Sequence, residues 1–370
     1  MTPPGNPIAA VTHPDPYPYY REMVATRPLH RDRDLGLWVA ASAEAVTAVL
    51  TSPLVRVRPP AEPVPASLRG SPLAEIFGRL VRMTDGPAHG PLKQVVAGAL
   101  ATLDGESVRA RAVGWARTLV ERIDAKSPAG VDELARSLSA HAIASLLAVP
   151  DAAVGPVERS VRQYVTAVAP GADAARLERG KVAAGHLVET VRAAVAGARA
   201  GLPVALGREA ERAGIADPAA VVANGAAGWM LRASVAANPA QLEAVVREVL
   251  RHDAPVQNTR RFLAADGVIG GQPMAAGDTV LVVLAAANHD AAANPRPERF
   301  DEARASRRTF TFGVGPHACP GETLAVSIAR AGVESLLAHG LDLDALPARP
   351  AYQPSGNVRI PLFAGAPGEG

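Results

Sequence analysis

The sequence contains little cysteine, no long apolar run and no block of like charge. Cys319 is the one cysteine among 370 residues, which excludes an internal disulfide and any zinc or iron–sulfur site built from several cysteines. We therefore expect a reducing environment and a cytoplasmic location. The first residues lack the charged and apolar regions of a signal peptide, and no run of 18 apolar residues occurs, so no membrane segment is predicted.

The balance of charges argues against two classes of partner. The 38 basic and 36 acidic residues leave a formal net charge of +2, which favours neither nucleic acid nor a polybasic membrane contact. Aromatic residues make up only 4% of the chain, but hydrophobic residues reach 48%, enough for a large core. No repeat or low-complexity linker divides the chain, so we expect a single domain over residues 1–370.

The spacing of apolar residues predicts a mainly α protein with a small β region. Expected helices cover residues 13–25, 131–149, 218–237, 240–252 and 321–339, and helical spacing dominates 87–212 as a whole. Expected strands lie within 29–42, 268–274, 278–288 and 357–363. The proline-rich stretch 52–70 predicts no regular element and is equally suited to a substrate-facing or a plain surface loop.

The solitary cysteine lies in "TFTFGVGPHACPGE", residues 309–322. A lone cysteine is most often core filler, but the glycines and prolines around Cys319 bend the backbone instead of building a core. The helix expected directly after it would direct free amides at the sulfur and favour a thiolate. Such a thiolate can be a nucleophile or a metal ligand, and His317 is poorly placed to serve as the base of a nucleophile.

The segment "FGVGPHACPG", Phe312 to Gly321, resembles the haem-binding loop of the cytochrome P450 superfamily at every fixed position of F-G-x-G-x-H-x-C-x-G. The resemblance implies the cytochrome P450 fold, haem b as cofactor and Cys319 as the metal ligand. It further implies that Phe312 and Gly313 lie around the sulfur side of the ring and that His317 reaches a haem propionate.

Upstream segments carry the same resemblance. Glu248 and Arg251 in "REVLRHDAPVQ" match the family's E-x-x-R, although such a pair alone is usually a solvated helix pair. "PERFD", residues 297–301, resembles the family segment before the haem loop. The resemblance implies that its arginine, Arg299, joins Glu248 and Arg251 in a buried structural network.

Two further segments match places where the family binds haem propionates. "PAHGPLK" puts His89 and Lys93 four residues apart, similar to the family's H-x-x-x-R with lysine in place of arginine. Lysine keeps the charge but loses the bidentate fork. In "PVQNTRRFLAADGVIGG" the resemblance implies Arg261 as a propionate ligand, with Arg260 as the alternative.

The expected distal helix departs from the family. Oxygen-activating members usually carry an acid and an alcohol there to deliver protons, whereas "NGAAGWMLRASVAANP" has Ser234 as its one hydroxyl and Arg232 as its one charge. These two residues are the candidate catalytic groups, and the catalytic residues otherwise stay unassigned. Only 14 positions separate Ser234 from Glu248, so the distal helix is expected to be shortened.

The resemblance implies a haem-thiolate monooxygenase, an oxidoreductase acting on a small organic substrate, with secondary metabolism as its expected setting. Two alternatives stay open, namely an enzyme that uses peroxide or does not activate oxygen, and a catalytically silent haem-binding protein. Electrons are expected from a separate ferredoxin and ferredoxin reductase. Substrate-facing residues are expected in 56–82, 221–234, 256–258 and 355–357.

Overall fold

A computed structural model describes residues 2–169, 172–215 and 242–365 of the chain. The predicted distal helix, with Arg232 and Ser234, lies outside the described residues.

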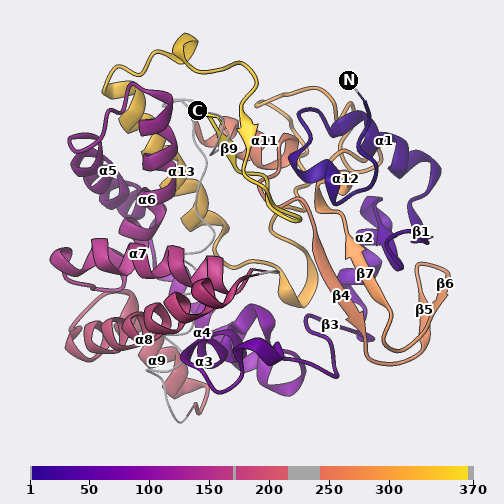
Figure 1. Cartoon of the computed structure of the whole chain (residues 1–370), viewed down its shortest axis with the longest axis horizontal. Helices are drawn as coiled ribbons and strands as arrows, with labels where there is room; N and C mark the ends of the chain where they lie inside the picture. Colours follow the sequence, from indigo (N-terminus) through magenta and orange to yellow (C-terminus); the bar gives the residue numbers. More distant parts are fainter. Residues whose placement is uncertain (1, 170–171, 216–241, 366–370) are drawn as a thin grey trace.

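Helices that begin at side-chain caps form the larger part of the molecule, on the left of Figure 1. Asp104, Ser127 and Asp173 each accept a hydrogen bond from an amide in the first turn of the helix that follows, which satisfies donors that have no partner within the helix. The helices are α3 (Pro72–Arg79), α4 (His89–Ala101), α5 (Gly105–Val120), α6 (Pro128–Leu146), α7 (Asp151–Ala167), α8 (Ala174–Gly197), α9 (Leu202–Arg212) and α13 (Glu322–Ala338).

Apolar faces of these helices share one core. α13 packs against α5 and α6, α7 packs along α8, and α4 packs on α9. The core cluster draws buried side chains from all of them, among them Leu134, Tyr164, Leu187 and Ile328. Such a shared core follows from helices that each bury one apolar stripe.

The smaller part, on the right of Figure 1, is built around a five-stranded sheet in the order β1-β2-β7-β4-β3. Its strands are β1 (Leu29–Asp32), β2 (Leu37–Ala40), β3 (Val55–Arg56), β4 (Thr259–Leu263) and β7 (Thr279–Val282). β2 and β7 pair in parallel, and the other neighbours are antiparallel. Two hairpins complete the strands: β5 (Gly267–Ile269) with β6 (Gln272–Met274), and β8 (Ala351–Tyr352) with β9 (Pro361–Leu362).

Four further helices belong to the described residues, and short 3-10 turns link the elements. The helices are α1 (Tyr17–Thr26), α2 (Ala43–Thr51), α11 (Leu242–His252) and α12 (Leu284–Asn288). The 3-10 turns are η1 (Ala9–Thr12), η2 (Ala66–Leu68), η3 (Val81–Met83), η4 (Gly86–Ala88), η5 (Gly315–His317) and η6 (Leu343–Ala345). The segment that leads into α13 runs between the helical part and the sheet part (Figure 1).

The prediction of a mainly α protein with a small β region is confirmed, with two local corrections. The strand expected over 278–288 ends at Val282, and Leu284–Asn288 form α12 instead. The alanines of this helix are almost fully buried. The run is apolar because every side of the helix is buried, and not because apolar and polar residues alternate as in a strand. Within 52–70, where no regular element was expected, β3 and η2 form.

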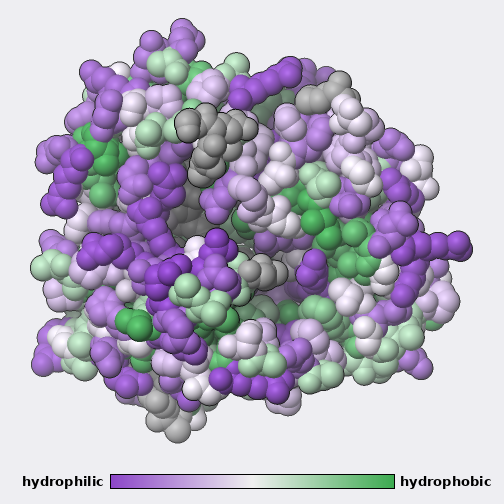
Figure 2. Space-filling view, in the orientation of Figure 1, coloured by the Kyte–Doolittle hydropathy of each residue, from purple (hydrophilic) through white to green (hydrophobic). Residues whose placement is uncertain are grey.

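Among the described residues, no helix combines the length and the apolar character needed to cross a bilayer. Hydrophilic side chains cover most of the face in Figure 2, and the surface is hollowed near its centre, between the helical and the sheet parts.

Candidate haem-binding site

The cysteine loop is held in shape by backbone hydrogen bonds and two left-handed glycines. Gly313 and Gly315 have φ values of +71° and +74°, a region that side chains with a Cβ disfavour. The amide of Cys319 donates to the carbonyl oxygen of Phe312 at 2.8 Å, which closes the loop. A Cβ on Gly315 would also lie only 3.1 Å from the Leu50 carbonyl oxygen, so the loop needs glycine there for space as well.

The sulfur of Cys319 lies at the head of α13. The Gly321 amide donates to Sγ at 3.4 Å, and a Cβ added to Gly321 would lie 3.7 Å from the same sulfur. An amide donor and the positive end of a 17-residue helix both favour negative charge on the sulfur. The side chain is neither fully buried nor fully exposed, so this sulfur can act as a thiolate ligand.

Four groups that carry or can carry positive charge meet beside the loop, and we call them the cationic cluster: His89, Lys93, Arg261 and His317. The rings of His89 and His317 stack with centroids 4.0 Å apart. Lys93, one turn after His89 on α4, donates to the carbonyl oxygen of Ala318. Arg261, on β4, is 7% exposed, whereas its neighbour Arg260 is exposed. Three separate segments thus supply the predicted groups, and Arg261 is the buried arginine of the pair.

The electrostatics of the cationic cluster favour an anionic ligand. Burial, together with the charges of His89, Arg261 and Lys93, lowers the pKa of His317 to about 3. Burial likewise lowers the pKa of His89, with Lys93 adding to the effect. Nδ1 of His317 is buried without a hydrogen-bond partner among the described residues. Haem propionates are carboxylates, so they would supply both the missing charge and the missing acceptor.

Asp85 is a member of the site that the motifs did not indicate. Its Oδ1 lies 3.5 Å from Nε2 of His317, and its carboxylate accepts from the amide of Val57 at 3.0 Å. The residue lies between two 3-10 turns and belongs to no family pattern used above. Its position four residues before His89 was the only available signal.

A buried network around Glu248 fixes the segment that leads into the cysteine loop. Glu248 and Arg251 are both 0% exposed, and Arg251 Nη2 lies 2.6 Å from Glu248 Oε1. Burial alone would raise the pKa of Glu248, but hydrogen bonds from Arg251 and Arg307 outweigh it and lower the pKa to about 2. Glu248 is therefore an ionised, fully paired carboxylate, as a buried charge must be.

The prediction that Arg299 contributes its side chain to this network was wrong. Arg299 is exposed, and only its carbonyl oxygen takes part, accepting from Arg251 Nη2 at 3.2 Å. Arg307 and Arg304 occupy the places expected for it, at 2.8 Å and 3.3 Å from the Glu248 carboxylate. The local backbone directs the side chain of Arg299 to solvent and returns the chain to Glu248 a few residues later.

The Glu248 network and two asparagines hydrogen-bond to the backbone that precedes the cysteine loop. Arg251 Nη1 donates to the carbonyl oxygens of Pro297 and Asn288 at 2.9 Å and 3.2 Å. Asn288 Oδ1 accepts from the Phe310 amide at 2.6 Å, and Asn294 Nδ2 donates to the Arg308 carbonyl oxygen at 2.8 Å. Phe312 packs on the cluster formed by α11 and α13. The irregular stretch before Cys319 is thus fixed by buried polar groups.

The segments predicted to face substrate fall into three groups. Residues 256–258 and 355–357 lie side by side, because the Gln257 amide donates to the Asn357 carbonyl oxygen at 2.9 Å and Asn258 Nδ2 donates to the Gly356 carbonyl oxygen at 2.9 Å. Residues 56–82 form β3, η2, α3 and η3 in part. Residues 221–234 lie outside the described residues.

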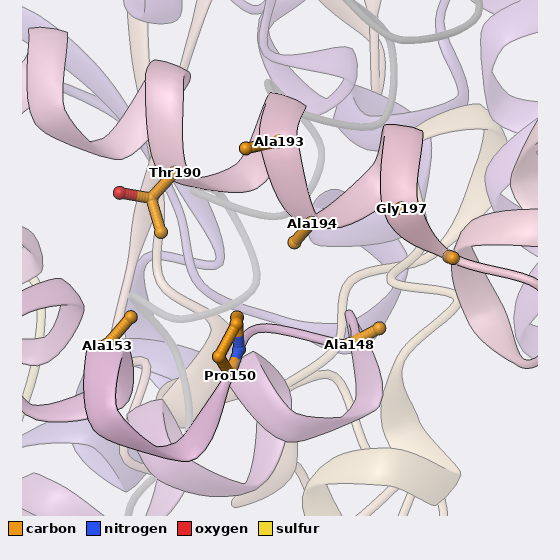
Figure 3. Close-up of a pocket in the computed structure, with 8 residues that line it drawn as sticks. Ala148, Pro150, Ala153, Thr190, Ala193, Ala194 and Gly197 are labelled. Atoms are coloured by element: carbon orange, nitrogen blue, oxygen red, sulfur yellow. The ribbon is translucent and has the colours of Figure 1, made fainter.

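A pocket of about 320 Å³ adjoins the cationic cluster, with Arg56, Arg58, Met83, Thr84 and Asp85 in its lining. A larger hollow of about 490 Å³ lies between the start of α7 and the C-terminal half of α8 (Figure 3). Small residues such as Ala153, Ala194 and Gly197 line it, with Thr190 as its one hydroxyl. None of its lining residues belongs to the sets predicted to contact haem or substrate.

Comparison with known proteins agrees with this geometry. The sequence model of the family described as Cytochrome P450 matches residues 240–339, which include Glu248, Arg261 and Cys319. The chain is 30% identical to the cytochrome P450 monooxygenase PikC of Streptomyces venezuelae, over 93% of this chain and 89% of that protein. It is 41% identical to the 20-oxo-5-O-mycaminosyltylactone 23-monooxygenase of Streptomyces fradiae, over 32% of this chain and 27% of that enzyme.

A solved structure is similar over nearly the full length. The crystal structure of CalO2 superposes with a TM-score of 0.79 at 27% sequence identity and covers 97% of both chains. The chain therefore shares its overall fold with CalO2.

Proposed function

The chain belongs to the cytochrome P450 family, and on that premise we propose that it is a haem-thiolate monooxygenase that oxidises a small organic substrate. The observation that carries the proposal is the pairing of one thiol at the head of α13 with the cationic cluster beside it. A haem needs a ligand for its iron and hydrogen-bond donors for its two propionates. The thiolate would serve the iron, and the cationic cluster would serve the propionates.

Haem b fits the residues present. Cys319 would bind the iron, and His89, Lys93, Arg261 and His317 would bind the propionates, with Asp85 holding the His317 ring. When bound, the haem supplies oxygen chemistry at an iron to which the thiolate donates electron density. The contribution of the chain is to place the sulfur beside the Gly321 amide, to orient Cys319 through the hydrogen bond from its amide to the Phe312 carbonyl oxygen, and to fix the segment before the loop through the buried Glu248 network.

The names of two relatives support a proposal for the substrate class. One relative is named as a 23-monooxygenase of a mycaminosyltylactone and another as 6-deoxyerythronolide B hydroxylase. We therefore place the substrate among the medium-sized products of secondary metabolism. Residues 56–82, 256–258 and 355–357 are proposed to contact it, together with 221–234 from outside the described residues.

We further propose that residues 1–370 act as one haem domain and take electrons from a separate ferredoxin and its reductase. A cytoplasmic location is proposed on the ground that the chain has one cysteine. Proton delivery is left to Ser234, Arg232 or substrate hydroxyls, since the acid–alcohol pair is absent from the sequence of the distal helix. That absence also favours peroxide use as the alternative activity.

The assignment of Cys319 is tested by carbon monoxide difference spectroscopy on protein expressed with haem supplied. Thiolate ligation shifts the Soret band of the reduced complex far to the red, so we expect this band for the wild type and not for Cys319→Ser. A wild type that binds haem without this band would contradict the proposed function. Turnover with a surrogate ferredoxin system, compared with turnover on peroxide alone, then separates the monooxygenase from the peroxide-using alternative.

A further inference from the structure

Asp85 stands at a position where aspartate normally caps a helical turn, but its carboxylate does not cap that turn. The residue directly precedes η4, and within Gly86–Ala88 no amide donates to its side chain. An aspartate that precedes a helical turn usually accepts a hydrogen bond from the second or third amide of the turn. The carboxylate of Asp85 instead contacts two segments that lie far away in the sequence.

The first of these segments begins just after β3. The Val57 amide lies 3.0 Å from one carboxylate oxygen of Asp85 and 3.3 Å from the other. Val57 is 6% exposed, so this contact satisfies a backbone donor that solvent does not readily reach. The carboxylate is therefore anchored on the backbone of a distant segment.

The second segment is the cysteine loop. Oδ1 of Asp85 lies 3.5 Å from Nε2 of His317, and the two side chains are 22% and 14% exposed. Partly buried groups of this kind are screened by salt less than surface pairs are. Because Nε2 faces Asp85, the other nitrogen of the ring, Nδ1, is left for a haem propionate. Nδ1 is buried and has no partner among the described residues.

Stacking on His89 holds the plane of the His317 ring but does not decide where its nitrogens point. The two rings lie with centroids 4.0 Å apart and planes inclined by 24°. A half-turn of the His317 ring about χ2 would keep that plane and exchange the positions of its nitrogens with those of its carbons. A carbon in the place of Nε2 would lose the contact with the Asp85 carboxylate. Asp85 thus selects one of the two ring orientations that stacking permits.

We propose that Asp85 is a positioning residue for the haem. It acts through His317, whose ring it orients toward a propionate, and it is itself held in place by the Val57 amide. The inference rests on the proposed function, because it concerns how the chain holds the cofactor of that reaction.

The first test measures the release of haem from the holoprotein to an excess of apomyoglobin, which absorbance follows without any turnover. Asp85→Asn keeps an acceptor oxygen for Val57 but removes the charge that faces His317, so release should accelerate about three- to tenfold. Asp266→Asn is the matched control. Asp266 also accepts from a backbone amide, that of Ala276 at 2.7 Å, but it does not contact the cationic cluster. Its variant should release haem at the wild-type rate, and equal rates for all three proteins would overturn the proposal.

A double-mutant cycle tests whether Asp85 acts through His317. His317→Phe keeps a ring that can stack on His89 but has no nitrogen to orient. In this background Asp85→Asn should change the rate of haem release by less than about twofold, because the two substitutions remove the same contact. An acceleration of the same size in both backgrounds would show that Asp85 acts by another route and would contradict the proposal.

Hydrogen exchange at the Val57 amide separates orientation of the ring from a local loss of structure. We expect this amide to stay protected within about twofold in Asp85→Asn and to exchange about tenfold faster or more in Asp85→Ala, which has no acceptor. If Asp85→Asn released haem faster only together with a loss of Val57 protection like that of Asp85→Ala, local unfolding would explain the release. The positioning role would then be wrong.

Failure of the proposed function is recognised separately, because the wild type would then lack the carbon monoxide band. A wild type that shows this band, with haem release that Asp85→Asn leaves unchanged, overturns the role of Asp85 alone.

Discussion

At the scale of single residues, Glu248 is the charge on which the site depends most. Its carboxylate accepts from Arg251 and Arg307 at 3.0 Å or less and is completely buried. Removing one partner of a buried ion pair leaves the others without compensation, which costs far more than the pair itself contributes. The three guanidiniums around Glu248 make this effect large.

We expect Glu248→Gln to lower the free energy of unfolding by about 3–5 kcal/mol and to reduce the haem content of purified protein. Urea unfolding and the ratio of Soret to protein absorbance measure the two effects. Glu243→Gln is the control on the same helix, because Glu243 pairs with Arg247 at the surface and such pairs contribute about 0–1 kcal/mol. Equal losses for both variants would contradict the buried-network assignment.

The same carboxylate sets a pH dependence. Its folded pKa of about 2 lies below the ordinary value of 4.5, so the unfolded chain binds more protons as the pH falls between these values. Stability from Glu248 is thus fully present above pH 4.5 and is lost toward pH 2. The difference in unfolding free energy between wild type and Glu248→Gln should narrow over that window, and a constant difference would contradict this origin.

The motifs predicted Cys319, Glu248 and Arg251 because local spacing alone defines them. The third arginine could not be predicted in this way, since several arginines follow Pro297 within a short irregular stretch. Which of them turns inward depends on the path of the backbone, and here Arg304 and Arg307 do while Arg299 does not.

At the scale of elements, the close packing of α7 on α8 depends on a glycine. A Cβ on Gly180 would lie 2.2 Å from Cβ of Ala167, far inside contact distance. Gly185 on the same helix has nothing within 4 Å of its Cβ position. The two glycines therefore separate the effect of packing from that of helix propensity.

We expect Gly180→Ala to lower the free energy of unfolding by about 1–3 kcal/mol through overpacking. Gly185→Ala should instead raise it by about 0.5–1 kcal/mol, because alanine favours the helix. Chemical denaturation of the two variants measures both signs. A stabilising Gly180→Ala would mean that α7 and α8 can move apart at no cost.

Element types were largely predictable, and their ends and exceptions were not. Helical spacing located the helices of the larger part except α3, which no expected helix covered, and the alternation in 29–42 located β1 and β2. The buried alanines of α12 show neither helical spacing nor strand alternation. The strand expected over 278–288 was therefore extended past Val282 into α12. An apolar run that is buried all round carries no periodic signal.

At the scale of the whole molecule, the two ends of the chain are anchored on distant elements. Asp132 on α6, 5% exposed, accepts from the Phe363 and Ala364 amides at 3.0 Å and 3.1 Å. Arg359 lies against the opposite end of the chain, where its Nη1 donates to the carbonyl oxygens of Val11 and His13. The sheet order and these hydrogen bonds bring together residues that lie hundreds of positions apart. A local sequence pattern cannot predict which of these residues pair.

We expect Asp132→Ala to release the end of the chain after β9 while leaving the helices folded. Hydrogen exchange of the Phe363 and Ala364 amides should speed up by about tenfold or more, since each loses a charge-assisted hydrogen bond. Asp132→Asn, which keeps one acceptor oxygen, should fall between wild type and Asp132→Ala. Unchanged exchange in the alanine variant would show that other contacts hold this segment.

Lys93 and Ala318 are in contact in the folded protein but lie 225 positions apart in the sequence. This separation has a consequence for biosynthesis. A ribosome makes the N-terminal part first, so α4 waits until the cysteine loop has been translated and has left the exit tunnel. A nascent chain arrested before that point would contain His89 and Lys93 but would lack Cys319. Capture of the cofactor is therefore a late, post-translational event, and truncated translation products should accumulate without colour.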